Sequence, residues 1–428
     1  MTLTYEQAGA LAWQWLEQIA RVSETDDPNR NGVTRLCATR EHRQALDMLG
    51  GWMRDAGMTL RSDNGANLIG RYASANPEAR TLLLGSHQDT VPHGGKYDGI
   101  MGVLLPLALV HYLEHHAVAL PFHLDVVAFS DEEGTRFSST LLGSKVLAGT
   151  FEPSMLDAQD DQGVTLRQAL IDFGCDPERI ADDRYAPGEV LGFVEVHIEQ
   201  GPQLEAEGLP IGVVSAITGI ERHKLSIHGL AGHAGTVPMH LRQDALVGAA
   251  RVIGLVDELC KATDALVGVV GKIDNSPNGV NVIPQRTDLT IELRSPDDAT
   301  RLAARETLLT RIDAALAELD LRLEQRLIYE QAAVQCAPAL VSRLEAAVAA
   351  SGVTPRTLFS GAGHDGLAMQ ALCDIGMLFL RCERGISHHP DEAIEPNDLG
   401  VAVEVLARLV TALAEDNHRS PGDQGAPA

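Results

Sequence analysis

Basic residues are scarce in this sequence. Its 428 residues contain 34 Lys and Arg against 59 Asp and Glu, which gives a formal charge of −25. A protein that binds nucleic acid or an anionic membrane surface needs a basic footprint. The acids are spread along the chain rather than gathered in a tail. The composition therefore argues against both kinds of partner and is typical of a soluble cytoplasmic protein.

Long apolar runs and paired cysteines are also missing. The longest apolar run, residues 100–110, is too short to cross about 30 Å of hydrocarbon. The first 20 residues contain Glu6 and Glu17 and no basic stretch, so they predict an amphipathic helix rather than a signal peptide. The six cysteines are scattered without a C-x-x-C pair, which indicates reduced structural thiols rather than a disulfide framework or a zinc ribbon.

The first half of the chain alternates apolar runs with helical patterns. Three runs have the length of a strand, at residues 81–84, 122–129 and 192–198, and a helix-length apolar segment covers 102–114. Short uninterrupted apolar runs are typical of strands that are buried on both faces of a sheet. Their alternation with helices predicts an α/β domain.

The pattern changes from about residue 211. Segments follow in the order strand, helix, strand, strand, helix, strand up to about residue 329, which fits a small α+β domain of the ferredoxin-like pattern. The chain then returns to α/β character. We therefore expect a larger domain with a mixed, mainly parallel sheet, made of residues 1–211 and 332–417, an inserted domain at 212–331, and a disordered tail at 418–428.

Histidines and acids gather just after the apolar strands. In chain order they are His87, Asp98, the pair Glu132 and Glu133, His197 and His388. Each of them alone has an ordinary structural explanation, such as a hydrogen-bonded histidine or an aspartate in a turn. Together they supply N and O ligands with few thiols nearby, which suits zinc, manganese or cobalt, and the ligand count fits two ions. Of two adjacent acids, one can bind a metal while the other moves a proton.

Several motifs are specific enough to indicate a family. Three resemble the signatures of dinuclear-metal amidohydrolases and peptidases related to aminoacylase and carboxypeptidase G: Gly85-Ser86-His87-Gln88-Asp89-Thr90-Val91-Pro92, the Gly-rich turn from Gly94 to Gly99, and Asp131-Glu132-Glu133-Gly134-x-Arg136-Phe137. Others resemble the hydantoinase/carbamoylase amidase branch: His197-Ile198-Glu199-Gln200-Gly201, His233-Ala234-Gly235-Thr236, Asn281-Val282-Ile283-Pro284, Gly361-Ala362-Gly363-His364-Asp365 and Ser387-His388-x-Pro390. The resemblance runs in order over about residues 30–400.

The resemblance implies a role for each residue of the predicted metal site. Asp98 would bridge two divalent ions, zinc or manganese with cobalt or nickel as alternatives, and the other protein ligands would be His87, Glu133, His197 and His388. The sequence leaves open which ligand serves which ion. His389 is the alternative to His388, which holds the His-x-Pro position of the motif.

The remaining roles concern catalysis and substrate binding. The resemblance implies that Glu132 is the general base and that Asp89 orients the imidazole of His87. It assigns substrate binding to Gln200, His233, Asn281, Arg294 and Gly363, with His233 also able to stabilise an oxyanion. The guanidinium of Arg294 suits a substrate carboxylate. In this family the inserted domain acts as a lid and forms a homodimer.

The resemblance implies an enzyme that hydrolyses the carbamoyl C–N bond of N-carbamoyl-L-amino acids. Allantoate amidohydrolase is the alternative, because allantoate also carries a carboxylate and ureido groups. A β-ureidopropionase is a less favoured alternative. A non-catalytic scaffold would need a broken site, whereas all the presumed ligands and the base are present in this sequence.

Overall fold

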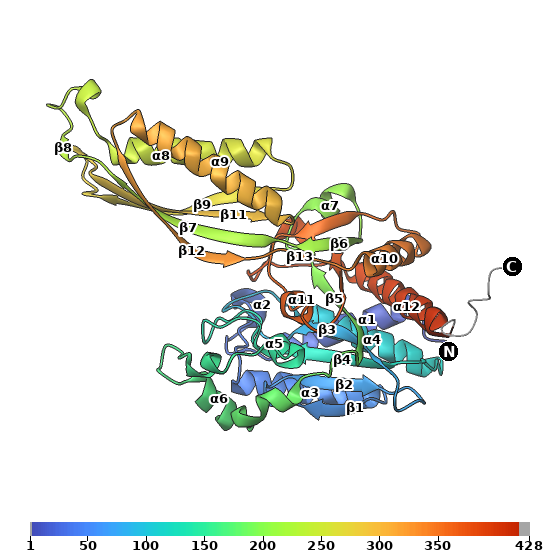
Figure 1. Ribbon diagram of the computed structural model, residues 1–428. Coiled ribbons are helices and arrows are strands. Elements are labelled where there is room, and N and C mark those ends of the chain that lie inside the picture. The colour runs from blue at the N-terminus through green and yellow to red at the C-terminus, as the bar shows by residue number, and fades with distance from the viewer. Residues whose placement is uncertain (1, 419–428) are drawn as a thin grey trace. The chain divides into compact units, whose positions relative to one another are not determined.

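The computed structural model describes residues 2–418, which form two compact units (Figure 1). Unit 1 contains the residues up to 215, together with 336–358 and those from 363 onward, and unit 2 contains 216–335 and 359–362. No helix within residues 2–418 has the length and apolar character needed to cross a membrane. The predicted tail, 418–428, lies outside the described residues except for His418, which ends α12 (Pro396–His418).

Unit 1 is built on a mixed sheet with a parallel centre. Its strand order is β1-β2-β4-β3-β5-β15-β6. The strands are β1 (Thr59–Ser62), β2 (Leu68–Tyr72), β3 (Thr81–His87), β4 (His123–Phe129), β5 (Val190–Ile198), β6 (Ile211–Ile217) and β15 (Ile375–Leu380). β3 runs parallel to β4 and β5, and β15 runs parallel to β5, whereas β2 and β6 are antiparallel to their neighbours. Every residue of β3, β4 and β15 is buried, as the apolar runs predict.

Helices complete the core of unit 1. The larger apolar cluster joins the sheet to α1, α3, α4, α10 and α12, and a smaller one is formed by α5, α6 and two 3-10 helices. Thr4 and Gln7 close a capping box at the start of α1, which fixes where this amphipathic helix begins. The helices are α1 (Tyr5–Ile19), α2 (Pro28–Asn31), α3 (Arg40–Asp55), α4 (Ile100–His115), α5 (Leu142–Ala148), α6 (Leu166–Asp172), α7 (Gln203–Glu207), α10 (Pro338–Ala350), α11 (Gly366–Met369) and α12, with 3-10 helices η1 (Pro153–Asp157), η2 (Pro177–Asp183) and η4 (Glu383–Gly385).

Unit 2 is an antiparallel sheet with two helices on one face (Figure 1). Its strand order is β12-β7-β11-β9. In chain order the main elements are β7 (Gly219–His228), α8 (Ala245–Ala262), β9 (Val267–Ser276), β11 (Arg286–Ser295), α9 (Asp298–Ala317) and β12 (Arg322–Gln331). This order confirms the predicted ferredoxin-like pattern. Shorter elements are β8 (Gly232–His233), which pairs with β10 (Val282–Ile283), the 3-10 helix η3 (Met239–Leu241), and β13 (Val334–Gln335), which pairs with the last residues of β6; β14 (Thr357–Ser360) also pairs with β6.

Candidate metal centre

Histidines and acids from separate strands meet at one edge of the unit 1 sheet. β3 ends at His87, Glu132 follows β4, and His197 lies one residue before the end of β5. The strands finish level with each other, since His87 is paired with Phe129, the last residue of β4. Parallel strands present their carboxyl ends at the same edge, where α/β proteins bind ligands. The sheet therefore brings together side chains that are far apart in sequence.

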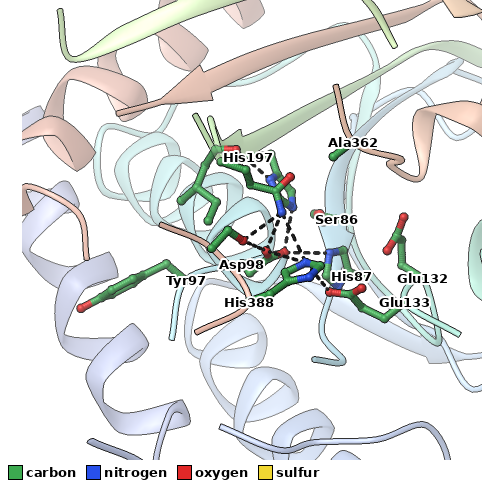
Figure 2. Close-up of polar contacts among 12 residues, drawn as sticks. Ser86, His87, Tyr97, Asp98, Glu132, Glu133, His197, Ala362 and His388 are labelled. Carbon is green, nitrogen blue, oxygen red and sulfur yellow. Dashed lines mark hydrogen bonds and ion pairs between the residues drawn. The ribbon is translucent and has the colours of Figure 1, made fainter. Parts of the chain in front are cut away.

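Asp98 reaches the same edge from the turn before α4. Gly99 follows it with a φ of +66°, and a Cβ built there would come within 2.3 Å of His87 Cε1, so the turn requires glycine. Asp98 Oδ1 lies 3.4 Å from His87 Nε2 and 3.1 Å from His197 Nε2. Asp98 Oδ2 lies 3.5 Å from His388 Nε2 (Figure 2). One carboxylate thus faces three imidazoles with its two oxygens.

The predicted ligands fall into two groups that share one residue. One group is His87, Asp98 and His197, and the other is Asp98, Glu133 and His388. Within each group, one ligand atom from every residue lies within 4.8 Å of the others. All five predicted ligands converge, and Asp98 belongs to both groups. A donor set of imidazoles and carboxylates at this spacing fits divalent cations of the zinc and manganese type.

Charges within the cluster hold the ligand side chains in place. Burial would raise the pKa of Asp98, but the facing imidazoles of His197 and His87 hold it well below its usual range. The contact with Glu133, at 3.3 Å, raises the pKa of His388 to about 9. These imidazoles can bind protons, and binding of a metal ion would release those protons.

Glu132 lies beside this cluster. It forms a further group with His87 and Glu133 in which the candidate ligand atoms are within 4.8 Å of one another. Burial raises the pKa of the Glu132 carboxyl well above its ordinary value, although His87 nearby acts in the opposite direction. A carboxyl with a raised pKa is suited to exchange protons near neutral pH. A Cβ built on Gly363 would lie 3.8 Å from Glu132 Oε1, so Gly363 is next to this carboxyl, as a pocket residue should be.

Asp89 faces two parts of the cluster. His87 Nδ1 contacts the main-chain oxygen of Asp89 at 3.0 Å and is 3.8 Å from its carboxylate. The carboxylate instead accepts the backbone N–H groups of Glu132 and Glu133, at 3.2 and 3.3 Å. The imidazole is therefore oriented by the main chain of Asp89, while the side chain holds the loop that carries the two glutamates.

Gln200 contacts Asp98 in this structure. Its Nε2 donates to Asp98 Oδ2 and to Ser387 Oγ, both at 2.9 Å. Its φ of 55° is unusual for a residue other than glycine, and such backbone is often found at functional sites. The other amide atom, Oε1, is buried and has no hydrogen-bond partner among the described residues. Gln200 thus lies at the predicted site and has one polar atom available to a ligand.

The two adjacent histidines of the C-terminal motif have different surroundings. His388 belongs to a ligand group with Asp98 and Glu133. His389 instead accepts the backbone N–H of Asp391 through Nδ1, at 3.1 Å, and most of its side chain is exposed. Among residues 2–418, no candidate ligand group includes His389. The geometry supports His388 over His389.

Three further polar residues lie at or beside the cluster, and none of them was assigned a role from the sequence. Ser387 Oγ donates to Asp98 Oδ2 at 2.7 Å. Glu195, two residues before His197 on the same face of β5, accepts the hydroxyl of Ser86 at 2.6 Å. Glu392 accepts backbone N–H groups of the Asp98 turn. For Glu195 a signal was present, because an acid at alternate spacing with a histidine in an apolar strand points to the same side of the sheet.

His233 and Asn281 lie together at one end of unit 2. His233 is in β8 and is paired with Val282 of β10. The backbone N–H of Ala234 donates to the main-chain oxygen of Asn281 at 2.9 Å. Both His233 and Asn281 are exposed. Figure 1 shows β8 beyond one end of β7, away from the first residues of that strand.

Arg294 lies towards the other end of unit 2, in the four-stranded sheet, which does not include β8. It is paired with Ile220 near the start of β7, whereas Arg286, eight positions earlier in β11, is paired with His228 at the end of β7. Eight residues of strand span about 26 Å. Arg294 donates from Nε and Nη2 to Glu292 Oε1, at 2.8 and 2.6 Å. Within one chain, Arg294 and His233 are therefore too far apart to contact the same small molecule.

Comparisons with known proteins identify the family of the chain. Residues 83–412 match the peptidase family M20/M25/M40. The chain is 39% identical over 407 residues to an N-carbamoyl-L-amino acid amidohydrolase of Geobacillus stearothermophilus, covering 95% of this chain and 99% of the relative. It is also 39% identical over 391 residues to an allantoate deiminase of Arabidopsis thaliana, covering 84% of this chain and 74% of the relative.

A solved structure extends the match to the whole fold. The crystal structure of a hydantoinase/carbamoylase family amidase from Burkholderia multivorans matches with a TM-score of 0.89 and 33% identity, covering 95% of this chain and 98% of the other. These findings confirm the resemblance that the sequence motifs indicated: the chain belongs to peptidase family M20/M25/M40 and, within it, is similar to the hydantoinase/carbamoylase amidases.

Proposed function

We propose that this protein is a dinuclear-metal amidohydrolase that cleaves the carbamoyl C–N bond of N-carbamoyl-L-amino acids. One observation carries the proposal: two groups of candidate ligands share the buried carboxylate of Asp98, with Glu132 beside them. Relatives named N-carbamoyl-L-amino acid amidohydrolase align over nearly the whole chain, which supports this substrate class.

Each ion would have its own set of ligands. His87 and His197 would hold one ion and Glu133 and His388 the other, with Asp98 bridging them. The two groups that share Asp98 support this assignment of ligands to ions. We propose zinc or manganese as the ions, since imidazole and carboxylate ligands suit both. Bound divalent ions supply polarisation of a substrate carbonyl and a lowered pKa for water.

Glu132 would move the proton. A water molecule gives its proton to the Glu132 carboxylate as its oxygen attacks the carbamoyl carbon. The C–N bond to the amino acid then breaks, and Glu132 returns the proton to the leaving nitrogen. The products are the free amino acid and carbamate, which decomposes to carbon dioxide and ammonia. The position of Glu132 next to His87 and Glu133 supports this role.

Substrate anchoring would fall to unit 2. Arg294 would bind the substrate carboxylate, and His233 with Asn281 would donate hydrogen bonds to the oxyanion. Glu292 contacts the guanidinium of Arg294 in this structure and would hold it in a fixed orientation. From unit 1, Gln200 would contribute its buried amide oxygen, which has no hydrogen-bond partner among the described residues.

We propose that two copies of the chain complete each site. Arg294 is paired near the start of β7, whereas His233 lies in β8, beyond the other end of β7 (Figure 1), so both can serve a single small substrate only if one of them comes from a second copy. β9 is an edge strand, and its exposed Val267, Val269 and Ile273 offer an apolar surface for pairing. A homodimer would bury this edge.

Allantoate is the alternative substrate. The Arabidopsis allantoate deiminase is as similar in identity as the bacterial carbamoyl amidohydrolase, so overall identity does not choose between them. Both substrates have a carboxylate and a carbamoyl nitrogen, and the same residues would serve either. A β-ureidopropionase remains a less favoured alternative. We also propose a cytoplasmic location, on the basis of the scattered cysteines and the overall composition.

Ammonia release by the manganese-loaded protein tests the proposal. The substrates would be a panel of N-carbamoyl-L-amino acids, allantoate and N-carbamoyl-β-alanine. Fast turnover of the panel with little on allantoate supports a carbamoylase. Preference for allantoate would change the substrate and leave the catalytic assignments in place, and no turnover of any of them with both ions bound would overturn the proposed function.

A further inference from the structure

The segment that contains His388 makes several contacts with the Asp98 turn. Ser387 Oγ donates to Asp98 Oδ2 at 2.7 Å, and His388 Nε2 is 3.5 Å from the same oxygen. Four residues after His388, Glu392 Oε1 accepts the backbone N–H groups of Tyr97 and Asp98, at 2.9 and 3.1 Å. This last contact joins residues that are 294 positions apart in sequence. It is directed at the main chain of the turn rather than at the Asp98 carboxylate.

The site of Glu392 is closely fitted to the turn. Its side chain is buried, and a Cβ built on Gly95 would come within 2.0 Å of Glu392 Cδ, so the carboxylate occupies space that only glycine leaves free. On its other side the turn is held by Glu17 of α1, which contacts Lys96 Nζ and the Tyr97 hydroxyl, both at 3.1 Å. The turn is therefore fixed from two directions.

Asp89 provides a second example of the same arrangement. Its buried carboxylate accepts the consecutive backbone N–H groups of Glu132 and Glu133. Glu392 does the same for Tyr97 and Asp98. In both cases a carboxylate that belongs to no ligand group among the described residues fixes the main chain of a loop that carries a predicted ligand.

We propose that Glu392 is a positioning residue of the metal centre, which sets the orientation of the Asp98 carboxylate relative to His388 through the backbone of the turn. The inference rests on the proposed function, in which Asp98 bridges two ions. Its physical basis is that small rotations of the Asp98 main chain displace both carboxylate oxygens at once. Partners one step removed from the metal commonly change metal affinity by about 10- to 100-fold.

Two substitutions at Glu392 test the inference. Glu392→Gln keeps an oxygen that can accept both N–H groups, whereas Glu392→Ala removes the acceptor. The measurement is the dissociation constant of each of two Mn²⁺ ions, by competition with a chromophoric chelator, alongside thermal unfolding of the metal-free proteins. We expect Glu392→Ala to weaken binding of at least one ion about tenfold or more, and Glu392→Gln to stay within about threefold of the wild type.

A control separates positioning from the general loss of a carboxylate that accepts two backbone N–H groups. Asp244 Oδ1 accepts the backbone N–H groups of Leu246 and Val247, at 3.0 and 3.2 Å, but it lies in unit 2, which carries no predicted metal ligand. Asp244→Ala should leave Mn²⁺ affinity unchanged. Gly95→Ala, which displaces the Glu392 carboxylate without removing it, should weaken Mn²⁺ binding like Glu392→Ala.

The outcomes distinguish this inference from the proposed function. If the wild type binds no Mn²⁺, the metal centre itself is wrong. If the wild type binds two ions and a folded Glu392→Ala binds them equally well, the positioning role alone is overturned. An equal loss in Glu392→Gln and Glu392→Ala would also overturn it, because the acceptor oxygen would then not be what matters.

Discussion

The two units place their predicted functional residues in contrasting ways. In unit 1, the candidate ligands converge on Asp98, and the side chains of His87 and His197 are each only 2% exposed. In unit 2, His233 and Asn281 are exposed and lie far from Arg294, which is paired near the start of β7. Parallel strands that end at one edge bring residues together, whereas an antiparallel strand carries them to opposite ends. The candidate ligands of unit 1 therefore converge within one chain, while under the proposed function the substrate residues of unit 2 would need a second copy.

Removing the shared carboxylate should break the metal centre completely. We expect Asp98→Ala to lose both ions, because Asp98 belongs to both ligand groups, and activity should fall to background. Metal content per chain after dialysis, measured by elemental analysis, checks this.

The adjacent histidines supply a matched pair for the same measurement. His388→Ala should lose one ion and His389→Ala should keep both, since only His388 belongs to a ligand group. Retention of both ions in Asp98→Ala, or equal effects of the two histidine substitutions, would contradict the geometry.

Removing the base should stop turnover without disturbing the metals. We expect Glu132→Gln to lower kcat by about 10³-fold, because a positioned base contributes about 10²- to 10⁴-fold and the amide cannot take a proton. Steady-state ammonia release gives kcat and KM, and metal content serves as the control. Full turnover with both ions bound would show that another group is the base.

Much of the fold could be predicted from the sequence, and the reason is burial. The central strands β3, β4 and β5 and the first eleven residues of α4, from Ile100 to Val110, are mostly buried and therefore have strong apolar patterns. β1, by contrast, is short and mostly exposed, and no such pattern predicted it. Exposed elements depend on pairing with a neighbour rather than on their own composition.

The site could be predicted only where side chains follow a strand or a known motif. His87 and His197 end apolar strands, so the sequence places them at a sheet edge. Glu392 lies in a loop and acts on the backbone of Tyr97, a contact between distant segments that no spacing indicates. The motif placed Asp89 beside His87, but which of its oxygens faces His87 depends on three-dimensional geometry.

Refolding two impaired variants together tests whether the substrate residues of unit 2 come from different copies of the chain. His233→Ala and Arg294→Ala should each be strongly impaired as pure proteins, because each would lack one substrate contact in every site. If each site takes these residues from different copies, unfolding and refolding the two variants together should restore about a quarter of wild-type activity, since half of the dimers would have one intact site.

Ammonia release of the mixture, compared with the unmixed variants treated in the same way, checks this prediction. Activity that remains at the level of the pure variants, while native mass spectrometry shows mixed dimers, would mean that one chain supplies both residues. The substrate residues would then need a different arrangement from the one proposed.

Replacing a buried histidine that has no carboxylate beside it should have the smallest effect, and the effect should be on stability alone. His42 is buried in unit 1; its Nδ1 accepts the backbone N–H of Ala38 at 3.0 Å, and its ring packs on Phe173. Burial lowers the pKa of His42 to about 3, opposite to the raised pKa of His87 beside Asp98. Below the ordinary pKa of about 6.5 the unfolded chain binds a proton that the folded chain excludes, so stability falls as the pH drops from about 6.5 towards 3.

His42→Gln removes this titration while keeping an oxygen that can accept the Ala38 N–H. Between pH 7 and pH 4.5 we expect the wild type to lose on the order of 2 kcal/mol more unfolding free energy than the variant, at up to about 1.4 kcal/mol per pH unit. Urea unfolding of the metal-free proteins measures the difference, and the carboxyl groups common to both proteins cancel. His115→Gln, at an exposed position of α4, should leave the pH dependence unchanged. Parallel pH profiles for the wild type and His42→Gln would show that His42 binds its proton equally well in the folded and unfolded protein. Burial would then not lower the pKa of His42.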